Sequence, residues 1–256
     1  MTSLLGIQAL DYQYLTLVLL ILLGASVIHG LLGLGFPMLA TPLLAMLTDV
    51  PRAMLMLLLP TMTLNTVSIA RGGHWRQSIG RFWPLALYVA CGSFAGTRLL
   101  ILTDPAPYKV LLALVLLGYL NIRRLGLPLG WVANRPRIAM AFFGLIAGVL
   151  AGTVNAAVPA LIIFVLELQL NPVVTVQTFN FCFFCGKLAQ AATFAAAGAL
   201  TLRIGLGTVP LAAICLAGMW IGMRLRGKVQ VAVYHRWLRR VLLLIAVLLL
   251  VQYFAG

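Results

Sequence analysis

A lysine in the middle of an apolar stretch is the residue of this sequence with the clearest chemical potential. Lys187 stands in FFCGKLAQ, near the centre of a segment that we expect to form one helix, about 172–197. An ionised lysine at the centre of a helix in lipid costs about 2.5 kcal/mol or more, so it usually faces a polar cavity or a partner. The chain has only four Asp and Glu residues, three of which we expect at the outer ends of helices. A bound anion is then its natural partner. The structural alternative is a lysine that snorkels, or that pairs with Glu167 or a carbonyl group.

Other polar side chains are spaced to join this lysine. Asn180 lies seven residues before it and Gln190 three residues after it, so one helix face can carry all three. Thr61 and Asn65 follow Pro60 in another apolar segment, with the same potential to bind an anion. The alternative for these residues is hydrogen bonding between helices.

Two interruptions in long apolar stretches could form an anion site. They read HGLLGLGFP (His29–Pro37) and AGTVNAAVP (Ala151–Pro159). A helix that restarts after such a break presents free N–H groups and the positive end of its dipole, which suits an anion. We expect Gly33 and Gly35 in the first break, and Thr153 and Asn155 in the second, to line that site. Asn155 could instead be a hydrogen-bonding helix cap.

Two titratable residues are candidates for gating or coupling. His29 begins the first break and could donate to the anion or carry a coupling proton, because its charge changes near neutral pH. Glu167 could act as a gate or a proton carrier. The alternatives are a structural hydrogen-bond donor and an interfacial carboxylate.

Motifs for enzymatic chemistry are absent from the sequence. It contains no G-x-S-x-G, H-E-x-x-H or phosphate-binding glycine loop and no close pair of carboxylates. The cysteines of the C-x-x-C at 182–185 lie in an apolar run with no second metal pair, so we interpret them as packing residues. We therefore expect no enzyme, no cofactor and no metal site.

Composition shows which solvent this chain needs. Of its 256 residues 63% are hydrophobic and 9% are charged, with 18 Lys and Arg against 4 Asp and Glu. A soluble domain has about 25% charged residues, so the surface of this chain must face lipid. The basic residues form short clusters between apolar runs, which argues against nucleic acid as a partner.

Two of the apolar stretches are too long to cross a bilayer once. Residues 12–48 would make a helix of about 55 Å, against a hydrocarbon core of about 30 Å. Residues 138–166 are also long, and each stretch contains one of the two interruptions. Each is therefore expected to be a broken or re-entrant helix pair.

The distribution of charge favours pairs that fold back. Suppose that residues 138–169 return to the side on which they start. All three basic clusters then share one side, as the positive-inside rule requires of cytoplasmic loops. These clusters contain thirteen of the eighteen basic residues: Arg71, Arg76 and Arg81; Arg123, Arg124, Arg135 and Arg137; and Arg224, Arg226, Lys228, Arg236, Arg239 and Arg240.

The two halves of the chain also repeat each other. PLALYVACGSFAGTRL at 84–99 and PLAAICLAGMWIGMRL at 210–225 share the frame P-L-A-x5-G-x3-G-x-R-L at an offset of 126. At the same offset Thr61 aligns with Lys187. The fold-back topology places the two copies in opposite orientations. Inverted repeats with interrupted helices are the usual construction of secondary transporters, whose substrate site lies at the midplane.

The paired glycine-rich breaks, the later prolines and the G-x3-G-x-R of each half resemble the sulfite exporter TauE/SafE family, also called the 4-toluene sulfonate uptake permeases. The resemblance spans about residues 13–250, although the first break reads G-L-L-G-L-G where the family has consecutive glycines. It implies a transporter of sulfite, sulfonates or related organic anions.

We therefore predict an all-α polytopic membrane protein with two inverted four-helix repeats, each beginning with a broken pair. The N-terminal repeat is expected at 1–122, a basic cytoplasmic linker at 123–137 and the C-terminal repeat at 138–256. The predicted function is secondary transport of sulfite or an organosulfonate, in the exporting direction, by alternating access at a midplane anion site.

The expected partners are a small anion and the lipid bilayer, with proton coupling and a homo-oligomer left open. The expected location is a bacterial inner membrane, with loops 71–81, 123–137 and 224–240 cytoplasmic. A transporter of another organic anion, such as a carboxylate, and a non-transporting membrane scaffold are the alternatives.

Overall fold

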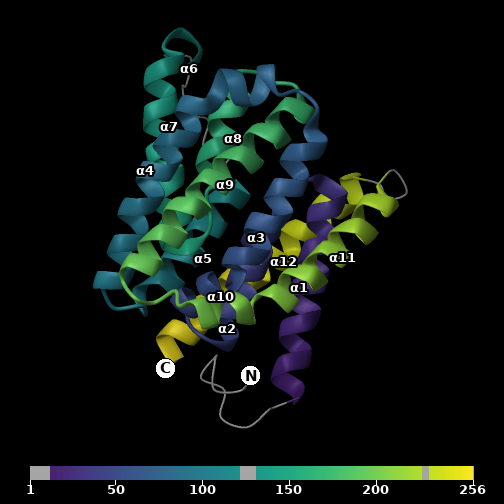
Figure 1. The fold of residues 1–256 in the computed structure, drawn as a ribbon, viewed down its shortest axis with the longest axis vertical. Helices are drawn as coiled ribbons and strands as arrows, with labels where there is room; N and C mark the ends of the chain where they lie inside the picture. The colour runs from purple at the N-terminus through teal and green to yellow at the C-terminus, as the bar shows by residue number, and fades with distance from the viewer. Residues whose placement is uncertain (1–11, 122–130, 227–230, 256) are drawn as a thin grey trace.

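The computed structural model describes residues 12–121, 131–226 and 231–255, with the backbone alone for 231–239 and 255. All regular elements in these ranges are helical, which confirms the predicted all-α class (Figure 1). The first half of the chain forms α1 (Tyr12–Leu32), α2 (Phe36–Leu47), α3 (Val50–Gly72), the π-helical turn η2 (Arg76–Gly80), α4 (Arg81–Leu102) and α5 (Pro107–Asn121). The second half forms α6 (Trp131–Asn134), α7 (Pro136–Val154), α8 (Val158–Glu167), α9 (Pro172–Ala196), α10 (Leu202–Gly207), α11 (Val209–Leu225) and α12 (Val231–Ala255).

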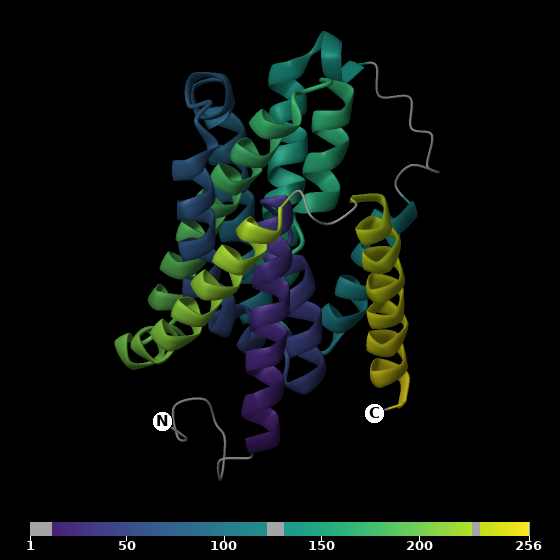
Figure 2. The same cartoon turned by 90° about the vertical axis from the view of Figure 1, so that its right-hand side faces the viewer.

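Both long apolar stretches are broken where the sequence predicts it. Residues 33–35 separate α1 from α2, and residues 155–157 separate α7 from α8. After each break the chain folds back, so that α2 packs against α1 and α8 packs against α7. The second pair lies side by side in the upper part of Figure 2. The predicted broken pairs are therefore confirmed, and α9 matches the single helix predicted for 172–197.

The breaks depend on residues that tolerate a left-handed backbone. Gly33 and Gly35 have φ angles of 81° and 102°, and Asn155 has a φ angle of 57°. Glycine adopts such angles without strain, and asparagine does so more readily than most residues. Pro37 and Pro159 follow in the first turns of α2 and α8, where a missing N–H removes no helical hydrogen bond.

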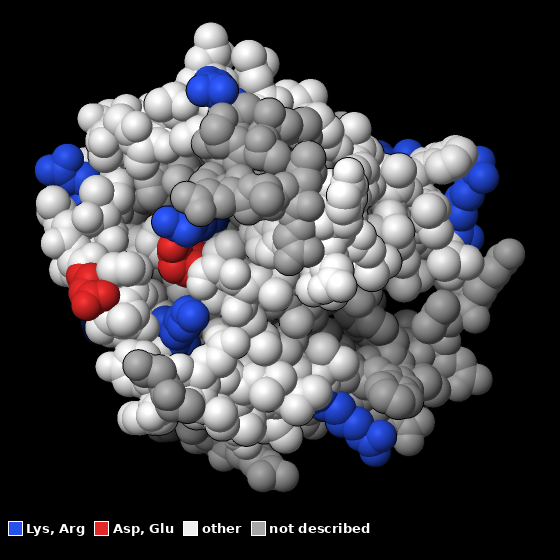
Figure 3. All heavy atoms as spheres, turned by 90° about the horizontal axis from the view of Figure 1, so that it is seen from below, with Lys and Arg blue, Asp and Glu red and all other residues white. Residues whose placement is uncertain are grey.

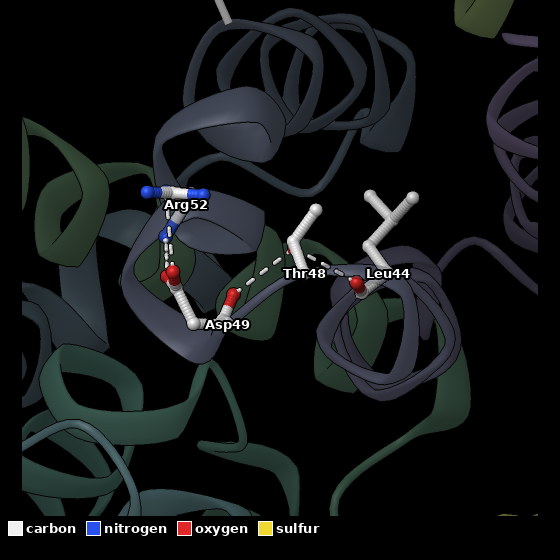
Figure 4. A network of polar contacts seen from close by, with 4 residues as sticks. All are labelled: Leu44, Thr48, Asp49 and Arg52. Carbon is white, nitrogen blue, oxygen red and sulfur yellow. Dashed lines mark hydrogen bonds and ion pairs between the residues drawn. The ribbon is translucent and has the colours of Figure 1, made fainter. Parts of the chain in front are cut away.

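A tight turn connects the first broken pair to α3 (Figure 4). Thr48 donates its hydroxyl to the carbonyl oxygens of Leu44 and Asp49, at 2.9 and 3.2 Å. Asp49 caps α3 by accepting from the backbone N–H of Arg52 at 2.8 Å, and its second oxygen lies 3.2 Å from Nε of the same arginine. A side-chain cap at this position satisfies an N–H that the helix itself leaves unpaired.

Helix α7 crosses α4 so closely that only glycine fits at the crossing. A Cβ on Gly148 would overlap the carbonyl oxygen of Val89, and a Cβ on Gly96 would lie 2.5 Å from the carbonyl oxygen of Val149. Membrane helices pack in this way when small residues let their backbones approach.

The same crossing recurs between α1 and α11. A Cβ on Gly30 would overlap the carbonyl oxygen of Met219, and a Cβ on Gly222 would overlap that of Val27. Gly222 holds the place in the repeated frame that Gly96 holds in α4. The first long helix of each half is thus packed against the G-x3-G helix of the other half. Figure 2 shows α11 crossing α1.

Helix α9 packs on α4, and α3 packs on α11. Equivalent helices of the two halves also pack together. Helix α3 packs on α9, and α5 packs on α12. In Figure 1, α1 runs upward from the N-terminal side, whereas α7 runs downward from α6. The inverted orientation of the two repeats in a membrane stays a prediction that this arrangement supports.

The outer surface suits a bilayer. Five helical segments of the described residues are long and apolar enough to cross a membrane: Tyr12–Leu32, Val50–Gly72, Arg76–Leu102, Pro136–Val154 and Leu202–Leu225. Large apolar side chains such as Leu87, Phe94 and Leu244 point outward and are exposed, as expected of a lipid-facing surface. Seen from below, the molecule shows mostly uncharged atoms, with basic and acidic side chains in small separate groups (Figure 3).

The basic segments are more helical than the sequence predicts. In the segment predicted as a loop at 224–240, α11 continues to Leu225 and α12 begins at Val231. Part of the 71–81 loop forms the turn η2. A helix satisfies its own backbone hydrogen bonds, so it can continue past the apolar run that crosses lipid. Residues 123–130 of the predicted linker and 227–230 lie outside the described residues.

We expect Gly148→Ala to destabilise the protein by about 1–3 kcal/mol, because the added methyl group forces α7 away from α4. Gly118→Ala in α5 is the matched control, since a Cβ there meets nothing within 4 Å and alanine favours a helix. Thermal unfolding in detergent measures both. Equal unfolding temperatures for the two variants would contradict the close crossing.

Candidate functional site

Lys187 lies in the interior of the molecule and is held by two amides. Its side chain is 6% exposed. Its Nζ donates to Oδ1 of Asn155 and to Oε1 of Gln190, both at 2.5 Å. Among the described residues no carboxylate lies within 4.0 Å of the Lys187 ammonium group. The ion pair found among them joins Arg52 to Asp49. The ammonium group is thus solvated by neutral dipoles alone.

Asn155 connects the lysine to both broken pairs. It is the C-cap of α7 and has a left-handed backbone conformation. Its Nδ2 donates to Oγ1 of Thr41 on α2 at 3.0 Å. Gln190 adds a third contact to the same region, because its Nε2 donates to the carbonyl oxygen of Ala151 at 3.3 Å. Lys187 on α9 is therefore hydrogen-bonded to Asn155 in the second break. Asn155 is hydrogen-bonded in turn to α2, the helix that follows the first break.

A small cavity surrounds this lysine, and we call it the Lys187 cavity. Its volume is about 20 Å³, room for about one water molecule. Thr61 on α3 lines it with a fully buried hydroxyl, for which residues 12–121, 131–226 and 231–255 supply no hydrogen-bond partner. Ala157 and Val158, where α8 begins, also line it, and helix geometry leaves the first N–H groups of α8 without intrahelical acceptors. The complete lining is Pro37, Thr61, Ser93, Ala151, Asn155, Ala157, Val158, Phe183, Gly186, Lys187 and Gln190.

A larger cavity lies towards the end of the molecule where α3 and α11 terminate, and we call it the arginine cavity. Its volume is about 310 Å³, and Arg71, Arg226, Ser68 and Gln177 are among its lining residues. Arg226 donates from Nε to the carbonyl oxygen of Leu31 and from Nη2 to that of Gly30, at 3.1 and 3.3 Å. Two guanidinium groups at one cavity create a positive potential that attracts anions.

Several predicted residues lie between the two cavities. His29 is buried, and its Nε2 lies 3.0 Å from Oγ of Ser68. Asn180 donates to the carbonyl oxygen of Gly33 at 2.7 Å, so it holds the first break. Asn65 is 0% exposed, and neither its side-chain oxygen nor its side-chain nitrogen has a hydrogen-bond partner among the described residues.

Comparison with protein-family models identifies the relatives of this chain. The model described as sulfite exporter TauE/SafE matches residues 17–253, nearly the whole sequence. The chain belongs to the TauE/SafE family. Neither the comparison with curated proteins nor the comparison with solved structures gave a match.

Membership in the TauE/SafE family confirms the resemblance drawn from the breaks and the repeat. The protein is a multi-pass membrane transporter of a family named for sulfite export, and this family consists of transporters rather than enzymes.

The structure brings only part of the predicted site together in this TauE/SafE protein. Four predicted residues line the Lys187 cavity: Lys187, Asn155, Gln190 and Thr61. Gly33 lines the arginine cavity. The others lie apart from both linings. A Cβ on Gly35 would meet nothing within 4 Å, Thr153 donates to the Val149 carbonyl of its own helix, and Glu167 ends α8.

Four residues that line the two cavities or contact Asn155 were not identified from the sequence. Ser93 lines the Lys187 cavity and donates to the Gly186 carbonyl at 2.8 Å; its place between the two glycines of the repeated frame was the available signal. Thr41 bonds Asn155 and carried no signal beyond lying four residues after Pro37. Arg71 and Arg226 were interpreted only as basic loop residues.

We expect Gln190→Leu to destabilise the protein by about 1–3 kcal/mol, because the Lys187 ammonium loses a partner that it cannot replace with water. Lys187→Met should hold or raise stability, since it removes a buried charge. The double variant should then be less destabilised than Gln190→Leu alone. Thermal unfolding of the three variants measures this coupling, and strictly additive effects would contradict the proposed role of the amide.

Proposed function

We propose that this protein is a secondary transporter that moves a small sulfur-containing anion, sulfite or an organosulfonate, out of the cell by alternating access at the Lys187 cavity. The observation that carries the proposal is a buried ammonium group whose partners are neutral amides. Family membership supports the substrate class.

A substrate anion would supply the charge that Lys187 lacks. Coulomb attraction is strong where water is excluded, so an oxyanion next to this ammonium gains more than it would at an exposed site. The Thr61 hydroxyl and the first N–H groups of α8 point to the same class of ligand, because both donate to oxygen atoms. The neutral amides can solvate the ammonium group again when the anion leaves, so the anion can be released, as transport requires.

The cavity in this structure is closed around the lysine. At about 20 Å³ it has room for about one water molecule and not for sulfite. Binding therefore needs Lys187 to part from Asn155 and Gln190, or the two broken pairs to separate. Both routes couple occupancy of the site to movement of one half against the other, as in alternating access.

The proposed orientation follows from charge. In Figure 1, α3 ends and α4 and α7 begin at the upper side, near Arg71, Arg76, Arg81, Arg135 and Arg137. Asp49 precedes α3 and Asp104 follows α4, at the opposite ends of those helices. We assign the basic side to the cytoplasm of a bacterial inner membrane. A proton gradient is the proposed drive, with His29 as its carrier and Glu167 as a gate.

We expect Lys187→Met to lower sulfite flux into proteoliposomes by about tenfold or more, since a hydrogen bond to a charged group is worth about 1.5–3 kcal/mol. Lys109→Met, at the start of α5, is the matched control and should keep its rate. Parallel assays with a short organosulfonate and a short carboxylate identify the preferred anion. Unchanged sulfite flux in the Lys187 variant would refute the site.

The Asn155→Asp variant tests whether the positive charge of Lys187 binds the substrate. The new carboxylate would sit where Oδ1 of Asn155 contacts Lys187, and it would act as a fixed counter-ion that competes with the substrate. Aspartate also tolerates the left-handed backbone at this position. We expect a folded protein whose unfolding temperature no longer rises with added sulfite, because a ligand stabilises only the state that binds it. A wild-type shift in this variant would argue against an anion at Lys187.

A further inference from the structure

The two cavities lie at the two ends of one helix interface. At one end Ser68 of α3 and Gln177 of α9 both line the arginine cavity, and Nε2 of Gln177 donates to the Ile69 carbonyl at 2.9 Å. At the other end Thr61 of α3 and Lys187 of α9 both line the Lys187 cavity. The α3–α9 interface therefore connects the cavities, over about 10 Å at 1.5 Å per residue along α3.

Helix α3 presents a row of polar side chains along this interface. Thr61, Asn65 and Ser68 are spaced by four and three residues, which places them on one helix face. They are 1%, 0% and 9% exposed. The Thr61 hydroxyl and both amide atoms of Asn65 have no hydrogen-bond partner in the part of the chain that the structure describes. An unpaired buried polar group costs about 1–3 kcal/mol, and lipid offers no water to relieve it.

The opposing elements add unpaired atoms to the same row. On α9, Asn180 lies between Gln177 and Lys187 on the common face, and its Oδ1 has no partner. On α1, Nδ1 of His29 has no partner, although Nε2 bonds to Ser68.

Polar residues with a purely structural role in this protein behave differently. At the α4–α7 crossing, Thr97 donates to the Gly152 carbonyl at 3.4 Å and Thr153 donates to the Val149 carbonyl at 2.7 Å. Neither hydroxyl is left unpaired. One of these bonds joins α4 to α7 and the other lies within α7, so hydrogen bonds account for both hydroxyls and do not account for Asn65.

We infer that the face formed by Thr61, Asn65, Ser68, His29 and Asn180 is the closed permeation path between the arginine cavity and Lys187, and that Asn65 is an anion-binding residue within it. This inference rests on the proposed function. The arginine cavity gathers oxyanions from the basic side of the molecule. When α3 and α9 separate, the hydroxyl of Thr61 and the amide of Asn65 donate to the passing anion in place of water.

Accessibility of single cysteines tests the path independently of transport rates. The background variant replaces the four native cysteines with alanine and must retain the unfolding temperature of the natural protein. Cysteine then replaces Thr61 or Asn65, or, as matched controls on the same helix, Leu57 or Leu64, which are both fully buried. The probe is the membrane-impermeant anion sulfonatoethyl methanethiosulfonate, added separately to each side of sealed vesicles.

We expect Asn65→Cys and Thr61→Cys to react from the side that carries Arg71, about tenfold or more faster than the two controls, and sulfite to slow both reactions, because bound ligand shields the path. Reaction at positions 61 and 65 no faster than at 57 and 64, from either side, would overturn the path.

Asn65→Leu gives a second measurement that does not depend on labelling. It should hold or raise the unfolding temperature, because it removes unpaired atoms, and it should lower sulfite flux about tenfold or more. Full flux in Asn65→Leu, with flux lost in Lys187→Met, would reject the path and leave the proposed function standing. Labelling at positions 61 and 65 without any sulfite flux would keep the path and reject the substrate.

Discussion

The architecture depends on two crossings at which helix backbones touch. Glycines of α1 and α11, and of α4 and α7, remove the side chains that would otherwise keep these helices apart. Lipid tails are as apolar as leucine, so membrane helices gain their association from such close packing rather than from hydrophobic burial. Because each crossing joins one half of the chain to the other, the two broken pairs come to face each other. The contacts among Thr41, Asn155 and Lys187 follow from that placement.

The polar interior reflects a compromise between the stability of the fold and the binding and release of a substrate. A carboxylate beside Lys187 would neutralise it permanently, and a fully apolar interior would offer an oxyanion nothing in exchange for its water. The structure instead surrounds the ammonium with amide oxygens, which stabilise a cation only in part. The nearby unpaired atoms of Asn65 and Thr61 add a further cost. In a transporter, groups that remain unsatisfied in one state can be satisfied by the substrate in another.

The sequence was sufficient where local chemistry decides the structure. Glycine and proline located both breaks, and uninterrupted apolar residues around Lys187 located α9. The spacing of three residues also predicted that Gln190 would share a face with the lysine. Contacts between distant segments were not predictable in this way. The bonds of Thr41 to Asn155 and of Arg226 to the end of α1 depend on how helices pack, and no residue pattern along the chain records them. The basic residues also led to a wrong prediction of a loop at residues 231–240, because α12 begins before its apolar part.

The exchange of partners between the halves constrains how the molecule is made. Helix α1 leaves the ribosome well before α11, against which its Gly30 packs. Until α11 is inserted, the face of α1 that carries Gly30 has no helix packed against it and stays open to lipid or to insertion factors. Assembly is therefore completed late and all at once, and a chain cut before α11 leaves its own beginning without a place to dock.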